Sequence, residues 1–177
     1  MIKEIARQLD NIEYGWKDKD GNIHLGVDDT FADNYVLQSP DEVLKNKIGV
    51  CWDQVELERK LFEDNNVSFN TYFIVHYDED KCPTHTFLIY KDGNKFGWFE
   101  HAWEAFKGIH EYESEEDAIK DIEEKFIERE LHNEYNPDNL YIYKYDKPKY
   151  GIGCLDFYKH CEAGITIKGI WLYEYRY

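Results

Sequence analysis

Residues 46–66, NKIGVCWDQVELERKLFEDNN, decide the fold prediction. From position 55 onward apolar residues recur with helical spacing, and charged residues stand between them. The pattern predicts a helix from about 51 to 64, ended by the pair Asn65-Asn66. A cysteine, Cys51, therefore occupies the first position of a helix.

The segment just before this helix, SPDEVLKNKIG at 39–49, predicts a second helix. Ser39 can cap its start, Pro40 suits the first helical position, and Glu42 completes a capping box. Gly49 is expected to end it. Two helices would then meet at a short turn directly before Cys51.

Three strand-like runs follow the cysteine helix, because aromatic and β-branched residues are concentrated in them. They are VSFNTYFIVHY at 67–77, THTFLIYK at 84–91 and KFGWFEHAW at 95–103. The residues KDGNK between the last two predict a hairpin, with Asp92-Gly93 as the turn pair.

The rest of the chain adds helices and strands at both ends of this segment. Helices are predicted at about 2–12, 114–132 (capped by Ser114) and 154–161, and strands at 140–145 and 169–177. The order of helices and mostly antiparallel strands predicts an α+β fold. Since neither a linker nor a repeat interrupts the sequence, we expect one domain over residues 1–177.

The charge composition excludes some classes of binding partner. The formal net charge of −16 argues against binding to nucleic acid, which needs clustered Lys and Arg, and against anionic membrane surfaces. The first residues lack the apolar core of a signal peptide, and no run of residues reaches the length of a membrane span. We therefore expect a cytoplasmic protein.

The four cysteines are then expected to be reduced thiols. None of them forms a CxxC pair, and the spacing of Cys154 and Cys161 is not typical of zinc sites. No histidine pair has a metal-binding spacing, and no phosphate-binding glycine motif is present. The sequence therefore predicts no metal and no cofactor.

The position of Cys51 at a helix N-terminus suggests that its thiol is reactive. A helix N-terminus carries partial positive charge and free N–H groups, which stabilise a thiolate and can bind a developing oxyanion. The alternative interpretation is structural, since a small buried cysteine is common where two helices meet.

A nucleophilic cysteine needs a base and a group that orients the base. If residue 91 pairs with residue 94 in the hairpin, His85 lies directly opposite Glu100, with Cβ atoms roughly 5 Å apart. The carboxylate would then fix one imidazole tautomer and leave the other nitrogen for the thiol. A turn at Gly93-Asn94 would instead set His85 opposite Ala102 and weaken this interpretation.

The other histidines are weaker candidates for the general base. Strand alternation points His101 to the opposite face from Glu100. The remaining five are expected at the surface or in packing contacts, and they are His24, His76, His110, His132 and His160.

Taken together, residues 49–75 and 84–103 resemble the transglutaminase-like superfamily, which has a papain-like core. In that family a cysteine opens a helix, and a histidine strand and an acidic strand follow. The resemblance covers about 39–104 and implies a core in which the cysteine helix packs on an antiparallel sheet. It implies Cys51 as the nucleophile, His85 as the base, and Glu100 in place of the usual aspartate.

One alternative assignment makes His101 the base, since His101-Ala102-Trp103 imitates the family's histidine motif. It would need an acid on a later paired strand, and EYESEEDAIK at 111–120 reads as loop and helix. We therefore prefer His85.

The resemblance implies acyl transfer through a thioester, with a peptide, a protein or a small amide as substrate and water or an amine as acceptor. The Cys51 N–H would bind the oxyanion together with one further donor, for which Trp52, Gln54 and Gln38 are candidates. Two alternatives stay open: a catalytically silent member that serves as a protein-binding module, motivated by the Glu-for-Asp change and the acidic surface, and an unrelated α+β protein with a structural cysteine. The oligomeric state stays open.

Overall fold

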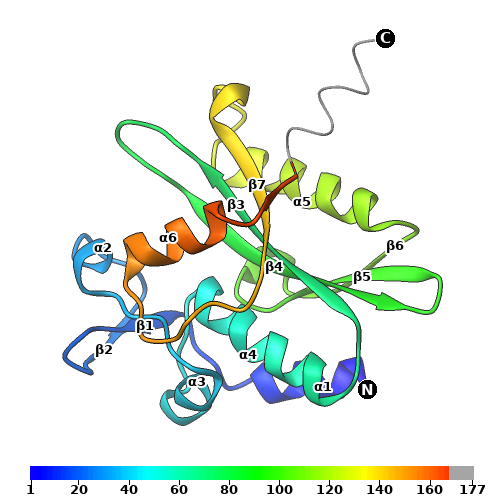
Figure 1. Ribbon diagram of the computed structural model, residues 1–177, viewed down its shortest axis with the longest axis horizontal. Helices are drawn as coiled ribbons and strands as arrows, with labels where there is room; N and C mark the ends of the chain where they lie inside the picture. The colour runs from blue at the N-terminus through cyan, green and yellow to red at the C-terminus, as the bar shows by residue number, and fades with distance from the viewer. Residues whose placement is uncertain (168–177) are drawn as a thin grey trace.

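The computed structural model describes residues 1–167, so the strand predicted at 169–177 lies outside the described residues. Figure 1 shows how the helices surround a central sheet. The helices are α1 (Ile2–Leu9), α2 (Phe31–Asn34), α3 (Pro40–Asn46), α4 (Cys51–Asp64), α5 (Glu115–Arg129) and α6 (Cys154–Glu162), with short 3-10 turns at Glu104–Phe106 and Pro137–Asn139. The strands are β1 (Gly15–Lys17), β2 (Ile23–Leu25), β3 (Phe69–His76), β4 (Thr84–Asp92), β5 (Lys95–Glu100), β6 (Gly108–Tyr112), β7 (Leu140–Tyr145) and β8 (Ile165–Thr166).

The central sheet has six strands in the order β6-β5-β4-β3-β7-β8, and every neighbouring pair is antiparallel. A separate two-stranded hairpin, β1-β2, precedes it in sequence. The prediction of an α+β fold is confirmed. Within residues 1–167, no helix combines the length and the apolar character that crossing a membrane requires.

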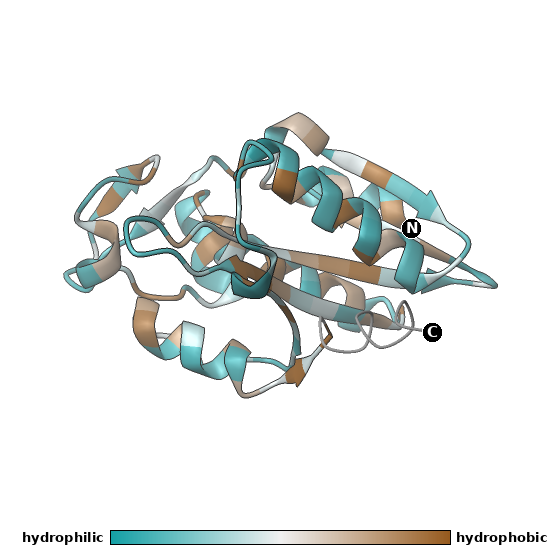
Figure 2. Ribbon diagram, turned by 90° about the horizontal axis from the view of Figure 1, so that it is seen from above, coloured by the Kyte–Doolittle hydropathy of each residue, from teal (hydrophilic) through white to brown (hydrophobic). Residues whose placement is uncertain are grey.

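Both faces of the sheet are covered, because strand side chains alternate between them. On β3, Tyr72 and Ile74 pack with α5, whereas Phe73 and Val75 pack with α6 and the start of α4. Further along the sheet, α1 and α4 cover Leu88 of β4. Hydrophobic segments accordingly run through the central strands in Figure 2, with helices of mixed character beside them.

The two predicted helices around the cysteine are present, with one correction. Ser39 accepts a hydrogen bond from the Glu42 N–H, and the capping box is complete. However, α3 ends at Asn46, where Lys47 takes the left-handed conformation (φ 54°), and not at Gly49. Gly49 is needed for space instead, because a Cβ atom there would lie 2.9 Å from the Cβ of Asp53.

A second correction concerns the segment after β5. We predicted loop and helix over residues 111–120, but Gly108–Tyr112 forms β6 and pairs with β5. Strand β6 is only five residues long and none of them is fully buried. Its alternation of apolar and polar residues is therefore a weak signal in the sequence. Helix α5 then begins at Glu115, capped by Ser114 as predicted.

Candidate active site

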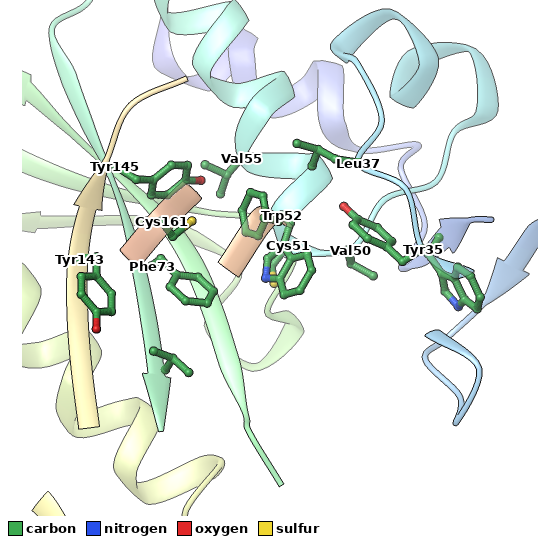
Figure 3. Close-up of a cluster of buried hydrophobic side chains, with 13 residues drawn as sticks. Tyr35, Leu37, Val50, Cys51, Trp52, Val55, Phe73, Tyr143, Tyr145 and Cys161 are labelled. Atoms are coloured by element: carbon green, nitrogen blue, oxygen red, sulfur yellow. The ribbon is translucent and has the colours of Figure 1, made fainter. Parts of the chain in front are cut away.

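Cys51 is the first residue of α4 and is buried, with 5% of its surface exposed. The carboxylate of Asp53 fixes the chain on either side of it. Asp53 accepts hydrogen bonds from the Val50 N–H (3.1 Å), the Gln38 N–H (2.9 Å) and the Tyr35 hydroxyl (2.8 Å). Figure 3 shows Cys51 between Trp52 and Val50 at the beginning of this helix.

His85 and Glu100 form a buried pair. The Nε2 atom of His85 donates to Oε2 of Glu100 at 2.7 Å, and the Trp103 N–H donates to the other carboxylate oxygen at 2.8 Å. The indole of Trp103 also contacts the imidazole, with 4.8 Å between the ring centroids. One carboxylate thus holds both the imidazole and the turn that follows β5.

The pair forms although the predicted register is wrong. Asp92 pairs with Lys95, so the turn is Gly93-Asn94, and the pairing, which runs as far as Leu88 with Phe99, would set Glu100 opposite position 87 rather than His85 if continued. A shift of two residues keeps every side chain on its face of the sheet. His85 and Glu100 are therefore diagonal neighbours, with a Cβ separation of roughly 7–8 Å that long side chains can bridge. Our expectation that this turn would weaken the pair is wrong.

The pKa of His85 reflects both Glu100 and the thiol of Cys51. Burial alone lowers the pKa of His85, but the charge of Glu100 and hydrogen bonds to Cys51 and Glu100 outweigh it and raise the pKa to about 10. His85 is thus an imidazolium at neutral pH, and a neighbouring imidazolium stabilises a thiolate. The structure pairs His85 with Glu100, and Cys51 is close enough to contribute to the pKa of His85.

Tyr14 lies close to Cys51, although no motif around it predicts this. Burial of its hydroxyl and a hydrogen bond to Cys51 raise the pKa of Tyr14. The residue as a whole is 45% exposed and lines the same cavity as Cys51. Tyr14 precedes β1 outside any recognisable motif, and only the tertiary fold brings it to Cys51.

Two of the three expected oxyanion donors already donate hydrogen bonds to backbone carbonyls. The Gln38 amide donates to the Ile48 carbonyl at 3.0 Å, and the Gln54 amide donates to the Gly49 carbonyl at 2.8 Å. The third, Trp52, stacks on Phe157 with 4.5 Å between the ring centroids. Both glutamines therefore stabilise the α3–α4 turn through these bonds.

Two cavities adjoin the three residues. The first, of about 280 Å³, is here called the polar cavity, and its lining includes His85, His101, Gln54, Glu104, Lys107 and Glu130. The second, of about 460 Å³, is called the apolar cavity, and its lining includes Cys51, Trp52, Val27, Phe31, Ala32 and Tyr158. Tyr14 and Thr84 line both cavities, so the two are neighbours.

His101 faces α4, as strand alternation predicts. Its Nδ1 atom lies 2.6 Å from Oε1 of Gln54. Since that oxygen can only accept, Nδ1 carries the proton. Burial lowers the pKa of His101 to about 4, so the ring is neutral and its Nε2 atom is a buried acceptor with no partner among the described residues. In this geometry His101 contacts Gln54 rather than a carboxylate.

Glu58 is a buried acid on α4 whose Oε2 atom has no hydrogen-bond partner among residues 1–167. Burial, and after it the charge of Glu100, raises the pKa of Glu58 well above its usual range. The carboxyl group is therefore neutral in the folded protein. The charges of His85 and Cys51 also act on it, so Glu58 lies near the site.

Replacement of Glu58 by Gln should make the protein more tolerant of rising pH. The folded-state pKa lies above the unfolded value, so the parent loses stability as pH rises from about 4 toward the folded pKa, whereas Gln does not titrate. We expect the variant to gain about 1 kcal/mol per pH unit over the parent between pH 5 and 7. Urea unfolding at pH 5, 6 and 7 measures this gain.

The matched control is Glu63→Gln, an exposed position on the same helix, which should differ from the parent by the same amount at all three pH values. A stability difference for Glu58→Gln that stays constant with pH would contradict a neutral Glu58.

An α+β fold with a cysteine at the start of a helix on an antiparallel sheet is consistent with a transglutaminase-like core. A comparison with protein families agrees, because the family described as "Transglutaminase-like domain" matches residues 2–96, more than half of the 177-residue chain. The chain belongs to this family. The matched range contains Cys51 and His85 and ends four residues before Glu100. A search of curated proteins found no match.

Proposed function

We propose that the protein is a cysteine acyl-transfer enzyme in which Cys51 is the nucleophile, His85 the base and Glu100 the group that orients it. One observation carries the proposal: the imidazole of His85 donates to the buried Glu100 carboxylate at 2.7 Å, and the thiol at the N-terminus of α4 contributes to the raised pKa of that imidazole. The apolar cavity, which Cys51 itself lines, gives a substrate access to the thiol.

The first chemical step follows from this arrangement. The Cys51 thiolate attacks an amide or ester carbonyl, and a carbon–sulfur bond forms while the carbonyl becomes an oxyanion. The Cys51 N–H, free at the helix start, is one donor to that oxyanion. The intermediate then collapses to a thioester as His85 gives its proton to the leaving group.

Tyr14 is our candidate for the second oxyanion donor. Tyr14 lines the apolar cavity together with Cys51, and Cys51 contributes to the raised pKa of the Tyr14 hydroxyl, whereas the amides of Gln38 and Gln54 donate to backbone carbonyls. When the substrate carbonyl reaches the sulfur, the hydroxyl can donate to the oxygen atom. Loss of one such donor typically raises the barrier by roughly 3–4 kcal/mol.

The substrate is proposed to be a peptide, a protein or a small amide, and the acyl acceptor is water or an amine. We also propose that residues 1–177 form one domain and that the protein acts in the cytoplasm. All four cysteines are free thiols in the structure, which suits a reducing compartment.

The proposal predicts selective alkylation of Cys51 by iodoacetamide at pH 7. Burial raises the pKa of Cys154 to about 11 and also raises that of Cys161, so both thiols should react slowly. Cys82 is exposed and serves as the reference for an accessible thiol. We expect Cys51 to react about tenfold faster than Cys82, as measured by peptide mass spectrometry after timed labelling.

The His85→Ala variant is the control for this experiment, since it keeps Cys51 but removes the imidazolium, and its Cys51 should react no faster than Cys82. Cys51 that reacts more slowly than Cys82 in the parent protein would favour a catalytically silent binding module.

A further inference from the structure

The two cavities differ in chemistry in a way that bears on the substrate. Among residues 1–167, no Asp, Glu, Lys, Arg or His side chain lines the apolar cavity, although the chain carries a net charge of −16. The polar cavity contains two carboxylates, one lysine and two histidines, which are Glu104, Glu130, Lys107, His85 and His101. The surroundings of the thiol are thus apolar, and those of the base are polar.

The chemistry of acyl transfer assigns the two parts of a substrate to these cavities. The acyl group becomes bonded to the sulfur, and Cys51 lines the apolar cavity only. The leaving group must receive a proton from the base, and His85 lines the polar cavity only. The partition between the cavities lies at Tyr14 and Thr84, which line both.

The apolar character continues out of the cavity onto the surface. Val27, which lines the cavity, is 54% exposed, and Leu25, two residues earlier in β2, is 75% exposed. Leu155, which follows the lining residue Cys154, is 67% exposed. Exposed apolar side chains around a cavity mark a binding site for apolar groups.

We propose that the substrate's acyl part is an uncharged apolar group, aliphatic or aromatic, bound in the apolar cavity, and that the leaving group and acyl acceptor bind in the polar cavity. This inference rests on the proposed function. It adds the substrate class: an apolar acyl group joined to a polar amine or alcohol. A cavity of about 460 Å³ has room for a phenylpropionyl or hexanoyl chain.

A series of p-nitrophenyl esters tests the assignment. Acetyl, butyryl, hexanoyl and 3-phenylpropionyl esters are compared with the succinyl ester, which matches butyryl in length but carries a charge. The rate of p-nitrophenolate release and the mass gained at Cys51 are measured, and each rate is divided by the rate of the same ester with glutathione. We expect hexanoyl and phenylpropionyl to acylate Cys51 at least about tenfold faster than acetyl, and butyryl about tenfold faster than succinyl.

A variant that fills the cavity provides the second measurement. Ala32 lines the cavity from α2 and is exposed, so Ala32→Trp adds bulk at the mouth without disturbing the core. Phenylpropionyl transfer should fall about tenfold, and acetyl transfer should stay within about twofold. Ala163→Trp, an exposed alanine outside the cavity lining, is the matched control and should change neither rate.

The outcomes separate the two proposals. If Cys51 is acylated at equal normalised rates by all chains in the parent protein, the acyl preference is overturned and the acyl-transfer function stands. Equal loss of acetyl and phenylpropionyl transfer in Ala32→Trp also contradicts the assignment. If no ester acylates Cys51, the proposed function itself fails, and the acyl preference fails with it.

Discussion

Glu100→Gln is expected to slow acylation of Cys51 roughly a thousandfold at pH 7 while the protein stays folded. Gln has the size of Glu and keeps one oxygen, which can still accept from the Trp103 N–H. Its amide then faces Nε2 of His85 and donates to it. The proton of the imidazole moves to Nδ1, toward Cys51, which is the wrong tautomer for a base.

The variant also removes the charge that keeps His85 protonated. With Glu100 ionised, the pKa of His85 is about 10, and without it burial is the dominant influence and lowers the pKa. The imidazolium should therefore be lost at a lower pH in the variant. Titration of His85 followed by NMR should show a transition near pH 10 in the parent protein and one at clearly lower pH in Glu100→Gln.

Two further variants test the position of the charge and the length of the side chain that carries it. Glu111→Gln changes an exposed glutamate on the neighbouring strand β6 and should leave the acylation rate within about twofold. Glu100→Asp keeps the charge but withdraws the carboxylate by one methylene, so it should be slower than the parent protein because the pair is diagonal. Full acylation by Glu100→Gln would exclude Glu100 from the orienting role.

Asp53→Ala should lower the free energy of unfolding by about 3 kcal/mol, because it leaves three buried donors without an acceptor. They are the Tyr35 hydroxyl and the backbone N–H groups of Gln38 and Val50. Each unsatisfied buried donor costs about 1–3 kcal/mol, and relaxation of the α3–α4 turn recovers part of the sum. Urea denaturation followed by circular dichroism gives the difference.

Asp64→Ala is the matched control for this experiment. Asp64 ends the same helix, is exposed, and makes a surface ion pair with Lys60 at 2.8 Å. Surface pairs of this kind contribute a few tenths of a kcal/mol, so we expect a loss below about 0.5 kcal/mol. If both variants unfold at the same urea concentration, Asp53 does not hold the cysteine turn.

The elements around the cysteine could be predicted because their signals are local. The capping box at Ser39, the cysteine at position 51 and the asparagines after Asp64 each mark a helix end through the chemistry of a few adjacent residues. The strands of the histidine and acidic segments were equally clear from composition. The face shared by His85 and Glu100 followed from alternation, which tolerates an error of two residues in register.

The parts that sequence reasoning missed depend on contacts distant in sequence. Nothing near Tyr14 indicates that its hydroxyl reaches a thiol in another element. The charged residues of α4 give no sign of their burial, yet Arg59 is 6% exposed because it bonds to Glu56 at 2.9 Å and to Thr71 on β3. Burial of such groups depends on the partners that tertiary folding brings to them.

The two oxygen atoms of Glu100 have separate tasks, and this has a consequence for regulation of the base. One oxygen aligns the imidazole, and the other holds the turn at Trp103, which forms one wall of the polar cavity. A molecule that displaces this turn would draw the carboxylate away from the imidazole. Occupancy of the cavity and basicity of the catalytic group are thereby thermodynamically linked through one side chain, so a ligand that binds there without reacting would act as an inhibitor.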